Sequence, residues 1–304
     1  MSLIDLHIHS NFSDDGQYSP AELIDKCLQA GIKYISIADH NSVKGIPKAI
    51  TAARWKDLEV IPAIELDCLI GQKNLHLLGY GINYTNPLFT KVEDDILNQD
   101  RLASTTRMSL IRDLGIEFDD KVIESLSVNG IVNGEMIAEA AMTYDVDHKN
   151  PLLQPYYEGG ERSDNPNANF YWDYCHQGKP GYVEVKFISI DEAVKLIKDN
   201  GGVPVLAHPG IIVGEDLDLL QNIVSSGVQG IEVYSSYHSN EQVEYYKKFA
   251  LEQKVLQTCG SDFHGKNKPN IYLGATGCEE QEEEIITFIK KRIKNNRKNN
   301  YKQA

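Results

Sequence analysis

The segment DLHIHS near the start of the chain carries two histidines two residues apart. In a strand over residues 3–9, the alternation of side chains places Asp5, His7 and His9 on one face and the apolar residues on the other. Two imidazoles on one strand face can form local hydrogen bonds, or they can bind one metal ion. This pair by itself is compatible with both, so the other histidines and carboxylates of the chain must decide.

Histidines and carboxylates also occur near the ends of several other predicted strands. The candidate metal ligands come from seven segments: His7, His9, Asp14 or Asp15, His40, Glu65, His76, His208, Asp262 and His264. Imidazole and carboxylate are ligand types that zinc, manganese and iron share. Any single one of them could instead be a core histidine, a salt-bridged carboxylate or a turn cap. Because burying so many polar groups costs free energy, the full set predicts a site for several metal ions.

Strand-like and helical segments alternate on both sides of a central region. Residues 19–31 predict a helix that is capped by Ser19 together with Glu22 and ends at Gly31. The alternation predicts an α/β fold with a parallel sheet, either doubly wound or closed into a barrel. Candidate ligands at the C-terminal ends of several strands favour a (β/α) barrel. No strand leads into a glycine-rich phosphate loop, which disfavours a Rossmann fold.

The strand pattern stops between residues 87 and 178. Helices are predicted over residues 90–114, 119–126 and 134–143, followed by a segment rich in Pro, Gly, Asn and aromatic residues. The aromatic residues favour an ordered loop. We therefore predict a discontinuous barrel domain of residues 1–86 and 179–289, a helical and loop insertion at 87–178 that caps the barrel mouth, and a basic tail at 290–304.

The formal net charge of −14 disfavours long nucleic acid as a partner, because such binding needs a basic surface. No apolar run is long enough to cross a membrane, and no secretory signal is evident, so no membrane partner is expected. Five scattered cysteines fit reduced thiols and a cytoplasmic protein. The sequence makes no prediction of an oligomeric state.

The C-terminal segment is basic, with seven lysines and arginines between Lys290 and Lys302. The acidic run EEQEEE precedes it, separated by the five residues IITFI. One interpretation is a solvated last helix with a frayed end. The other is a weak contact for polyanions.

Five motifs occur in order along the chain: HIHS, ADHN, AIELD with LHLLGYG, LAHPG, and GSDFHG. Together they resemble the polymerase and histidinol phosphatase (PHP) family of metal-dependent phosphoesterases, over residues 1–82 and about 180–280. The resemblance implies a distorted, TIM-like (β/α)7 barrel that holds two to three divalent metal ions (manganese, zinc or iron). The helical insertion matches the stand-alone branch of the family, which acts on nucleotides and short RNA ends.

The resemblance also implies how the ligands are shared among three ions. One ion takes His7, His9, Glu65 and Asp262; a second takes Glu65, His76 and His208; a third takes Asp15, His40 and His264. Counting back from Pro20 through the capped helix favours Asp15 over Asp14 as the aspartate. Asp5 and Asp39 lie beside ligands and are interpreted as partners that orient imidazoles, or as purely structural residues.

The predicted function is hydrolysis of a small, nucleotide-like phosphomonoester by a metal-activated water at a trinuclear site. The alternatives are a histidinol-phosphate phosphatase, a 5′-end exonuclease on short RNA, or a non-catalytic metal- or phosphate-binding module. His238, in GIEVYSSYHS, is predicted to contact the substrate phosphate or to donate a proton, unless it is an exposed loop histidine.

The insertion departs from its branch at one position. Where that branch carries arginine, proline and histidine together, this chain has Asn133, Gly134 and Glu135. A phosphate clamp must then come from elsewhere, and the candidates are Arg101, Arg107 and Arg162, unless these are surface residues.

Overall fold

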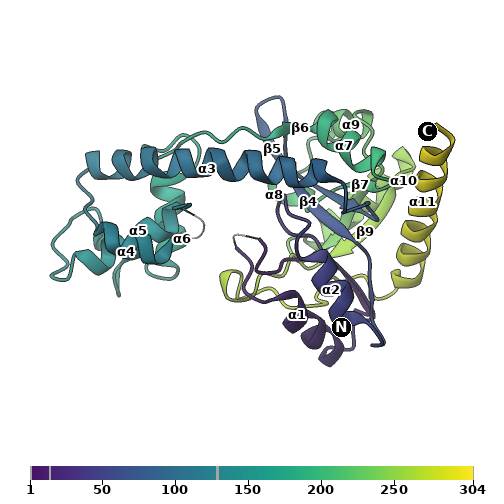
Figure 1. Cartoon of the computed structure of the whole chain (residues 1–304), viewed down its shortest axis with the longest axis horizontal. Coiled ribbons are helices and arrows are strands. Elements are labelled where there is room, and N and C mark those ends of the chain that lie inside the picture. Colours follow the sequence, from purple (N-terminus) through teal and green to yellow (C-terminus); the bar gives the residue numbers. More distant parts are fainter. Residues whose placement is uncertain (1, 14, 128–129, 304) are drawn as a thin grey trace. The chain divides into compact units, whose positions relative to one another are not determined.

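The computed structural model describes residues 2–13, 15–127 and 130–303 of the chain (Figure 1). It has an α/β fold, as predicted, and divides into two compact units. Unit 1 comprises Met1–Glu93 and Phe187–Ala304, and unit 2 comprises Asp94–Lys186. Helix α3 (Pro87–Asp113) begins in unit 1 and continues into unit 2. The boundary between the units therefore falls inside α3, after Glu93, whereas the predicted insertion began at residue 87. The first turn of α3 belongs to unit 1 because Phe89 packs into the core of that unit.

Unit 1 contains two β-sheets. The first is parallel and has the order β1-β2-β3, with β1 (Ile4–Ile8), β2 (Tyr34–Ile37) and β3 (Glu59–Val60). The second has the order β6-β4-β5-β7-β8-β9, with β4 (Ala63–Ile70), β5 (Lys73–Tyr80), β6 (Ile188–Ser189), β7 (Val203–Leu206), β8 (Gly230–Ser235) and β9 (Leu256–Gly260). Isolated parallel bridges join Ile8 to Phe263 and His40 to Glu65. Among the described residues the strands do not form one continuous closed ladder.

The expectation of an all-parallel sheet is wrong at β5. This strand pairs antiparallel with both of its neighbours, β4 and β7. Only Gly71 and Gln72 separate β4 from β5, and Gly71 has a φ of +62°. A two-residue connection can join only antiparallel strands, since a parallel crossover needs a dozen or more residues.

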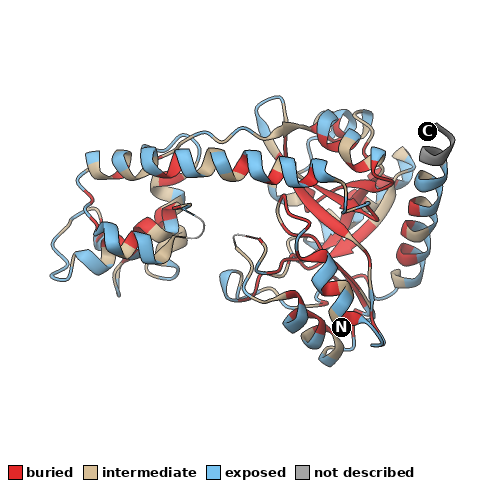
Figure 2. Cartoon of the chain, in the orientation of Figure 1, coloured by how far each residue is buried: buried red, intermediate tan, exposed pale blue. Residues whose placement is uncertain are grey.

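Helices of unit 1 pack around these strands. They are α1 (Pro20–Gln29), α2 (Ile46–Ala53), α7 (Ile190–Asp199), α8 (Pro209–Ile212), α9 (Leu217–Ser225), α10 (Asn240–Gln253) and α11 (Glu282–Gln303), with a short 3₁₀ turn, η3 (Gly265–Asn267). The predicted capping box of α1 is confirmed, because the Ser19 and Glu22 side chains each accept a hydrogen bond from the backbone N–H of the other residue. The strands form most of the buried interior of this unit (Figure 2).

The C-terminal segment is part of helix α11, which lies alongside β7 and β9 (Figure 1). Ile285, Ile286, Ile289 and Ile293 are buried in the core of unit 1. The predicted last helix is confirmed, and this isoleucine stripe at helical spacing anchors it as far as residue 293. After Ile293 the described side chains are mostly exposed, and fraying of the end stays a prediction.

Unit 2 is mainly helical and has its own apolar core. Its elements after α3 are α4 (Asp120–Leu126), α5 (Gly134–Tyr144), η1 (Gln154–Tyr156), α6 (Pro166–Phe170) and η2 (Tyr171–Cys175), so the predicted helices in this region are confirmed. Tyr156 and Phe170 are buried, as expected for an ordered aromatic loop. Asn133 caps α5 by accepting from the backbone of Met136, which gives this unusual residue a structural role. Throughout the described chain, every helix is too short or too polar to cross a membrane.

Candidate metal centre

The predicted ligands of unit 1 converge where the strands end. His7 and His9 lie at the end of β1, His40 follows β2, and His208 follows β7. Asp262 and His264 follow β9. Glu65 and His76 lie on the paired strands β4 and β5, where Glu65 is opposite Leu78 and His76 is opposite Asp67. Their ligand atoms form four overlapping groups that could hold metal ions, and each group shares at least one residue with another.

Glu65 lies at the centre of these groups. Its Oε1 atom is 3.1 Å from His76 Nδ1 and 3.2 Å from His208 Nε2. Its Oε2 atom is 3.1 Å from Nε2 of both His7 and His9. One carboxylate thus faces two histidine sets with different oxygens, which is the geometry of a bridging ligand.

The first group combines His7, His9, Glu65 and Asp262, as the resemblance implied. The two Nε2 atoms of His7 and His9 lie 3.0 Å apart. Asp262 Oδ1 is 3.4 Å from the former and 3.1 Å from the latter. All four side chains are buried. Their ligand atoms therefore surround one small volume.

The outward nitrogens of these two histidines are held by other side chains. Nδ1 of His7 is 3.1 Å from Glu232 on β8, and Nδ1 of His9 is 3.0 Å from the hydroxyl of Ser13. Such contacts fix the ring orientation and leave Nε2 for a metal ion. Glu232 also accepts from the backbone N–H of His208 (2.8 Å), so one carboxylate orients parts of two ligand segments.

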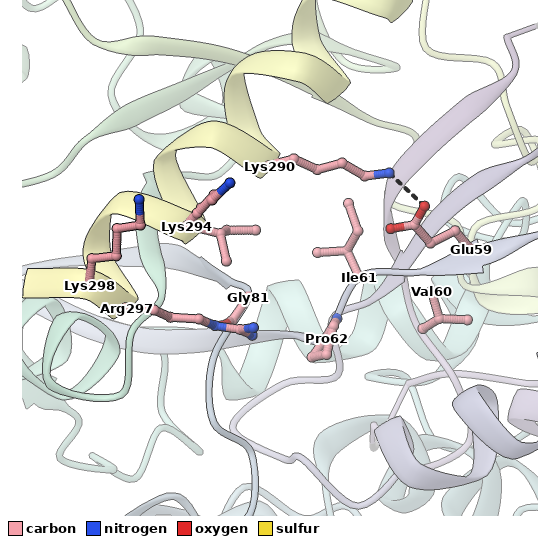
Figure 3. A pocket seen from close by; sticks show the side chains of 10 residues that line it. Glu59, Val60, Ile61, Pro62, Gly81, Lys290, Lys294, Arg297 and Lys298 are labelled. Carbon is pink, nitrogen blue, oxygen red and sulfur yellow. Dashed lines mark hydrogen bonds and ion pairs between the residues drawn. The ribbon is translucent and has the colours of Figure 1, made fainter. Parts of the chain in front are cut away.

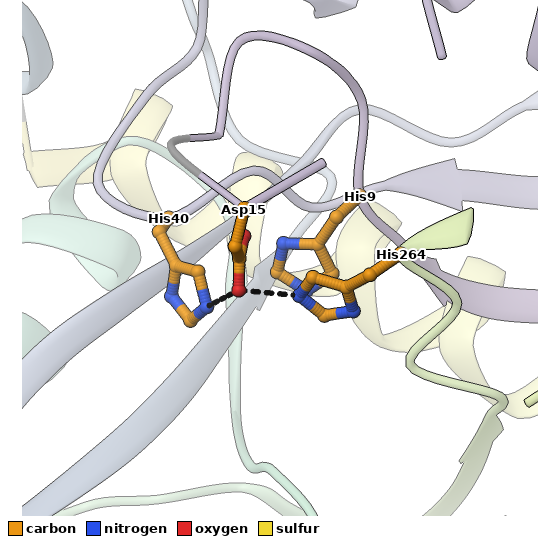
Figure 4. Close-up of side chains that lie close together, drawn as sticks. All are labelled: His9, Asp15, His40 and His264. Carbon is orange, nitrogen blue, oxygen red and sulfur yellow. Dashed lines mark ion pairs between the residues drawn. The ribbon is translucent and has the colours of Figure 1, made fainter. Parts of the chain in front are cut away.

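A second group lies next to it and contains His9, Asp15, His40 and His264 (Figure 4). Asp15 Oδ2 is 2.9 Å from His264 Nε2 and 3.8 Å from His40 Nε2. The resemblance implied three of these residues, and the structure adds His9. Asp14, the alternative aspartate, lies outside the described residues.

Asp67 is a candidate ligand that the sequence analysis missed. It forms a group with His40 and His76, and its Oδ1 is 3.1 Å from His76 Nε2. Its other oxygen accepts from the side chain of Asn41 (2.6 Å). The signal was present in AIELD, because Asp67 is two residues after Glu65 on the same strand and so shares its face.

The centre concentrates buried negative charge. Burial opposes ionisation of Glu65, yet the imidazoles around it, His7 foremost, hold its pKa well below the usual range. Burial likewise opposes protonation of His7 and His76, but the carboxylates, Glu65 first, raise the pKa of each well above its usual value. Burial lowers the pKa of His9 to about 4, and His264 adds to this effect. The site therefore favours bound positive charge, which protons or metal ions can supply.

The donor set fits metal ions better than it fits a hydrogen-bonded core. Several buried atoms make no hydrogen bond of good geometry among the described residues: Asp15 Oδ1, His40 Nδ1, Glu65 Oε2, His208 Nδ1 and His264 Nε2. The near neighbours of Glu65 Oε2 and His264 Nε2 are other candidate ligand atoms. The Nδ1 atom of His264 is already 2.8 Å from the carbonyl of Asp262, which leaves Nε2 as the candidate ligand atom. Buried polar atoms without partners are costly unless an ion completes them.

Backbone strain gathers at the same place. Asn41, His208 and Asp262 have φ angles of +54°, +20° and +60°, although none is glycine. Such conformations cost on the order of 1–3 kcal/mol each and cluster at functional sites. The loops at the strand ends therefore hold these three residues in a backbone conformation that is unfavourable for residues other than glycine.

Asp5 and Asp39 do not orient imidazoles, so that interpretation is wrong. Asp5 accepts from the backbone and hydroxyl of Ser261 and from the backbone of Gly274. Asp39 accepts from the backbone and hydroxyl of Ser10. Burial raises the pKa of each to about 6, opposed by these hydrogen bonds. The hydrogen bonds of both carboxylates go to backbone N–H groups and serine hydroxyls, so Asp5 and Asp39 stabilise the loops that carry candidate ligands.

Asp262 has two partners that the sequence analysis also missed. Its Oδ2 accepts from the hydroxyl of Tyr237 and from Lys268 Nζ, each at 2.6 Å. The Lys268 nitrogen lies 5.5 Å from the centre of the Tyr237 ring. These contacts fix the outer oxygen of Asp262 while its other oxygen faces the histidines.

His238 contacts backbone on both sides of its ring. Nδ1 is 2.8 Å from the carbonyl of Val233, and Nε2 accepts from the N–H of Gly210 at 3.0 Å. Burial lowers its pKa. A neutral ring with both nitrogens engaged holds the loop after His208, and its predicted contact with substrate stays a prediction.

The three candidate clamp arginines lie in unit 2. Arg162 donates two hydrogen bonds to Asp173 (3.0 and 2.9 Å), and Arg107 donates to the carbonyl of Val132 (2.6 Å). Arg101 donates to Asn98 at 2.8 Å. Their role as a phosphate clamp stays a prediction.

The family model of the PHP domain matches residues 5–201, which carry six of the nine predicted ligands. The chain belongs to the PHP family. This membership confirms the resemblance that the five motifs indicated.

Curated relatives of this PHP chain are similar over most of their lengths. A 3′,5′-nucleoside bisphosphate phosphatase from Chromobacterium violaceum is 27% identical over 91% of this chain and 92% of the relative. A 5′-3′ exoribonuclease from Haemophilus influenzae is 26% identical over 86% and 89%. A phosphoribosyl 1,2-cyclic phosphate 1,2-diphosphodiesterase from Eggerthella lenta is 25% identical over 86% and 94%. The predicted enzyme class, a phosphoric ester hydrolase, agrees with all three.

Solved structures resemble this PHP chain in fold. An amidohydrolase from Chromobacterium violaceum, solved with bound sulfate and no metal, has a TM-score of 0.70 and 26% identity, covering 87% of this chain and 88% of that one. A candidate metal-dependent phosphoesterase from Bifidobacterium adolescentis has a TM-score of 0.73 and 24% identity, covering 95% and 96%. The second likeness concerns the fold alone.

Proposed function

We propose that this PHP chain hydrolyses a small, nucleotide-like phosphomonoester at a centre of two to three divalent metal ions. The observation that carries this proposal is the position of Glu65, whose two oxygens face separate histidine sets. A non-catalytic module has no need for overlapping ligand groups built around one shared carboxylate.

The ligands would be divided among three positions. His7, His9, Glu65 and Asp262 would hold one ion, and Glu65, His76 and His208 a second. Asp15, His40 and His264, with His9 beside them, would hold a third. When bound, such ions lower the pKa of water toward neutrality and neutralise phosphate oxygens, whichever of manganese, zinc or iron is present.

The chain's own residues prepare this chemistry by orientation. Glu232 and Ser13 contact the outward nitrogens of His7 and His9, so that the opposite nitrogens face Glu65 and Asp262, where an ion would lie. Tyr237 and Lys268 hold the outer oxygen of Asp262. Lys268, whose side chain is one-third exposed, is the cation that an incoming phosphate would meet beside the centre.

The barrel belongs to the same proposal. The bridges join the end of β1 to Phe263 after β9, and His40 after β2 to Glu65 in β4. They favour a distorted barrel in which β1, β2, β4, β5, β7, β8 and β9 surround the ligands. In such a barrel the active site lies at the C-terminal ends of the strands, where His9, His40, His208, Asp262 and His264 are.

A nucleotide-like substrate is supported by the bisphosphate phosphatase among the relatives, which aligns over nearly the whole chain. The formal charge of −14 favours a substrate with few phosphates over a long polyanion. The exoribonuclease relative supports a second candidate, cleavage at the 5′ end of short RNA.

Hydrolysis rates on substrates of increasing length test the proposal. With manganese added, we expect faster turnover of a nucleoside 3′,5′-bisphosphate than of an RNA pentamer with a 5′ phosphate. A rate that increases with RNA length would favour the exonuclease. An enzyme inactive on both and on p-nitrophenyl phosphate would contradict the proposal.

A further inference from the structure

A cavity of about 410 Å³ lies in unit 1 away from the metal centre (Figure 3). Its lining residues come from β3, the following turn, the end of β5 and α11: Glu59, Val60, Ile61, Pro62, Gly81, Lys290, Ile293, Lys294, Arg297 and Lys298. Glu59 pairs with Tyr34 at the start of β2, whereas His40 of the metal centre follows the end of that strand. Pro62 precedes Glu65 by three residues, roughly 10 Å along an extended strand. The cavity therefore lies at the start of β2, the metal centre lies past the end of that strand, and the two sites are separate.

The wall of the cavity is cationic. Lys290, Lys294, Arg297 and Lys298 project from successive turns of α11, and Glu59 is the one carboxylate among the lining residues. A helix dipole favours basic residues in its last turn. That effect does not account for Lys290 and Lys294, which lie more than two turns before the end of α11 at Gln303.

Two of the four cations are held in place. Lys290 pairs with Glu59 at 2.5 Å and lies 4.6 Å from the centre of the Tyr34 ring. Arg297 donates to the carbonyl of Gly81 at 3.0 Å. Asn296 adds hydrogen bonds to Gly202 and Gln229, which anchor this part of the helix. The wall is thus fixed to the sheet rather than free to move away.

The other two lining cations are Lys294 and Lys298. Within the described parts of the chain, neither Lys294 nor Lys298 makes a hydrogen bond or an ion pair. Opposite them the cavity has an apolar side, made by Val60, Ile61 and Pro62. A ligand that satisfies both sides has an anionic group for the lysines and an apolar or planar group for the floor.

We propose that this cavity is a second binding site, for a small organic phosphate such as a nucleotide. The phosphate would lie between Lys294 and Lys298, and the base or another apolar group would cover Ile61 and Pro62. This site is separate from the metal centre and does not depend on metal ions or on the proposed hydrolysis.

Calorimetric titration of the full chain tests this site after chelation of metals. The probe is the methylene analogue of ADP, which resists hydrolysis between its phosphorus atoms. Because anions could also bind at the metal-free centre, substitutions in the cavity must show which site holds the probe. We expect one probe per chain, bound about tenfold more tightly than inorganic phosphate because of the apolar floor.

Two double variants locate the binding. Lys294→Glu/Lys298→Glu should weaken it by about tenfold or more, since two attractions become repulsions. Lys91→Glu/Lys291→Glu makes the same charge change at exposed lysines outside the cavity and should bind as the parent does. Both variants should keep the parent's phosphatase activity when assayed without the probe.

Three outcomes would overturn the inference. They are no binding to the parent chain, equal binding to both double variants, and equal affinity for inorganic phosphate and the analogue. If Lys294→Glu/Lys298→Glu unfolds, the milder Lys294→Gln/Lys298→Gln variant replaces it, with weaker binding still required. Loss of hydrolysis in the metal-loaded enzyme would instead concern the proposed function, because this titration contains no metal.

Discussion

At the scale of single residues, Glu232 connects two ligand segments of the metal centre. Its carboxylate accepts from the ring of His7 and from the backbone of His208. Glutamine at this position keeps one acceptor and places an amide donor against the other donor. We expect Glu232→Gln to lower metal affinity or turnover by about 10- to 100-fold, as for other residues that orient ligands.

Metal content and p-nitrophenyl phosphate hydrolysis measure this effect. Glu252→Gln makes the same change at a side chain that is 58% exposed and should leave both unchanged. A Glu232→Gln enzyme with the parent's metal content and rate would show that the contact does not orient His7.

Asp67 is the candidate ligand that was not predicted from the sequence, and a substitution at this position tests its role. Asparagine keeps its shape and the partner Asn41, but it removes the charge that faces His76. If Asp67 binds a metal ion with His40 and His76, Asp67→Asn should lose part of the bound metal and about tenfold or more in turnover.

Elemental analysis of the purified variant checks this expectation. Asp57→Asn, at a side chain that is 89% exposed, is the control. Full metal occupancy in Asp67→Asn would leave Asp67 only as a hydrogen-bond partner of His76.

At the scale of elements, the close approach of β1 and β9 sets the geometry of the first ligand group. A Cβ atom at Gly260 would overlap the backbone and Cβ of His7 and would lie 2.5 Å from Glu232 Oε1. Since two of these contacts involve β1 itself, the strand has to move. We expect Gly260→Ala to lower the free energy of unfolding by about 1–3 kcal/mol and to reduce metal binding.

Gly31→Ala is the matched control at the end of α1. Gly31 has open space around it but a φ of +78°. The substitution should therefore lower the free energy of unfolding by about 1 kcal/mol without affecting bound metal. Urea unfolding and metal analysis of both variants separate the effects. Equal metal content in the two would contradict the role given to Gly260.

The sequence predicted most elements because their signals are local. The capping box of α1 and the helices α3, α4 and α5 follow from caps and apolar spacing within a few residues. The antiparallel course of β5 was missed although the Gly71–Gln72 turn is local, because the alternating strand and helix pattern elsewhere outweighed it. The burial of the isoleucines of α11 depends on the strands that the helix packs against, which are distant in sequence. The basic residues of the same segment suggested a solvated helix instead.

Candidate ligands were predictable by type and by strand position, whereas their partners were not. His7, His9, Glu65 and Asp262 occur in short motifs. Glu232, Tyr237 and Lys268 meet those ligands only through strand pairing and loop return over long sequence separations. Nothing in their local sequence distinguishes them from ordinary polar residues.

At the scale of the whole molecule, unit 2 has its own apolar core and its own ion pair. Tyr156 and Arg162 both contact Asp173. Burial raises the pKa of this carboxyl, but the hydrogen bonds from Tyr156 and Arg162 outweigh it and hold the pKa below the ordinary value of 3.8. A carboxyl with a depressed pKa in the folded state stabilises fully above its ordinary pKa and loses that contribution as pH falls further.

Unit 2 should therefore lose stability below about pH 3.8 by way of Asp173. Asp173→Asn should be less stable than the parent at pH 7, and the difference should shrink as the pH falls below that value. Hydrogen exchange of unit 2 amides follows this unit separately. A difference that stays constant from pH 7 to pH 3 would contradict the assignment.

The central claim is that the overlapping ligand groups around Glu65 bind several metal ions that phosphoester hydrolysis requires. The most direct measurement combines elemental analysis of protein purified without chelator with p-nitrophenyl phosphate hydrolysis before and after metal removal. We predict about two to three equivalents of manganese, zinc or iron per chain, turnover abolished by chelation, and recovery on adding metal back. A chain that binds no metal, or one that hydrolyses the ester equally well after complete metal removal, would contradict the claim.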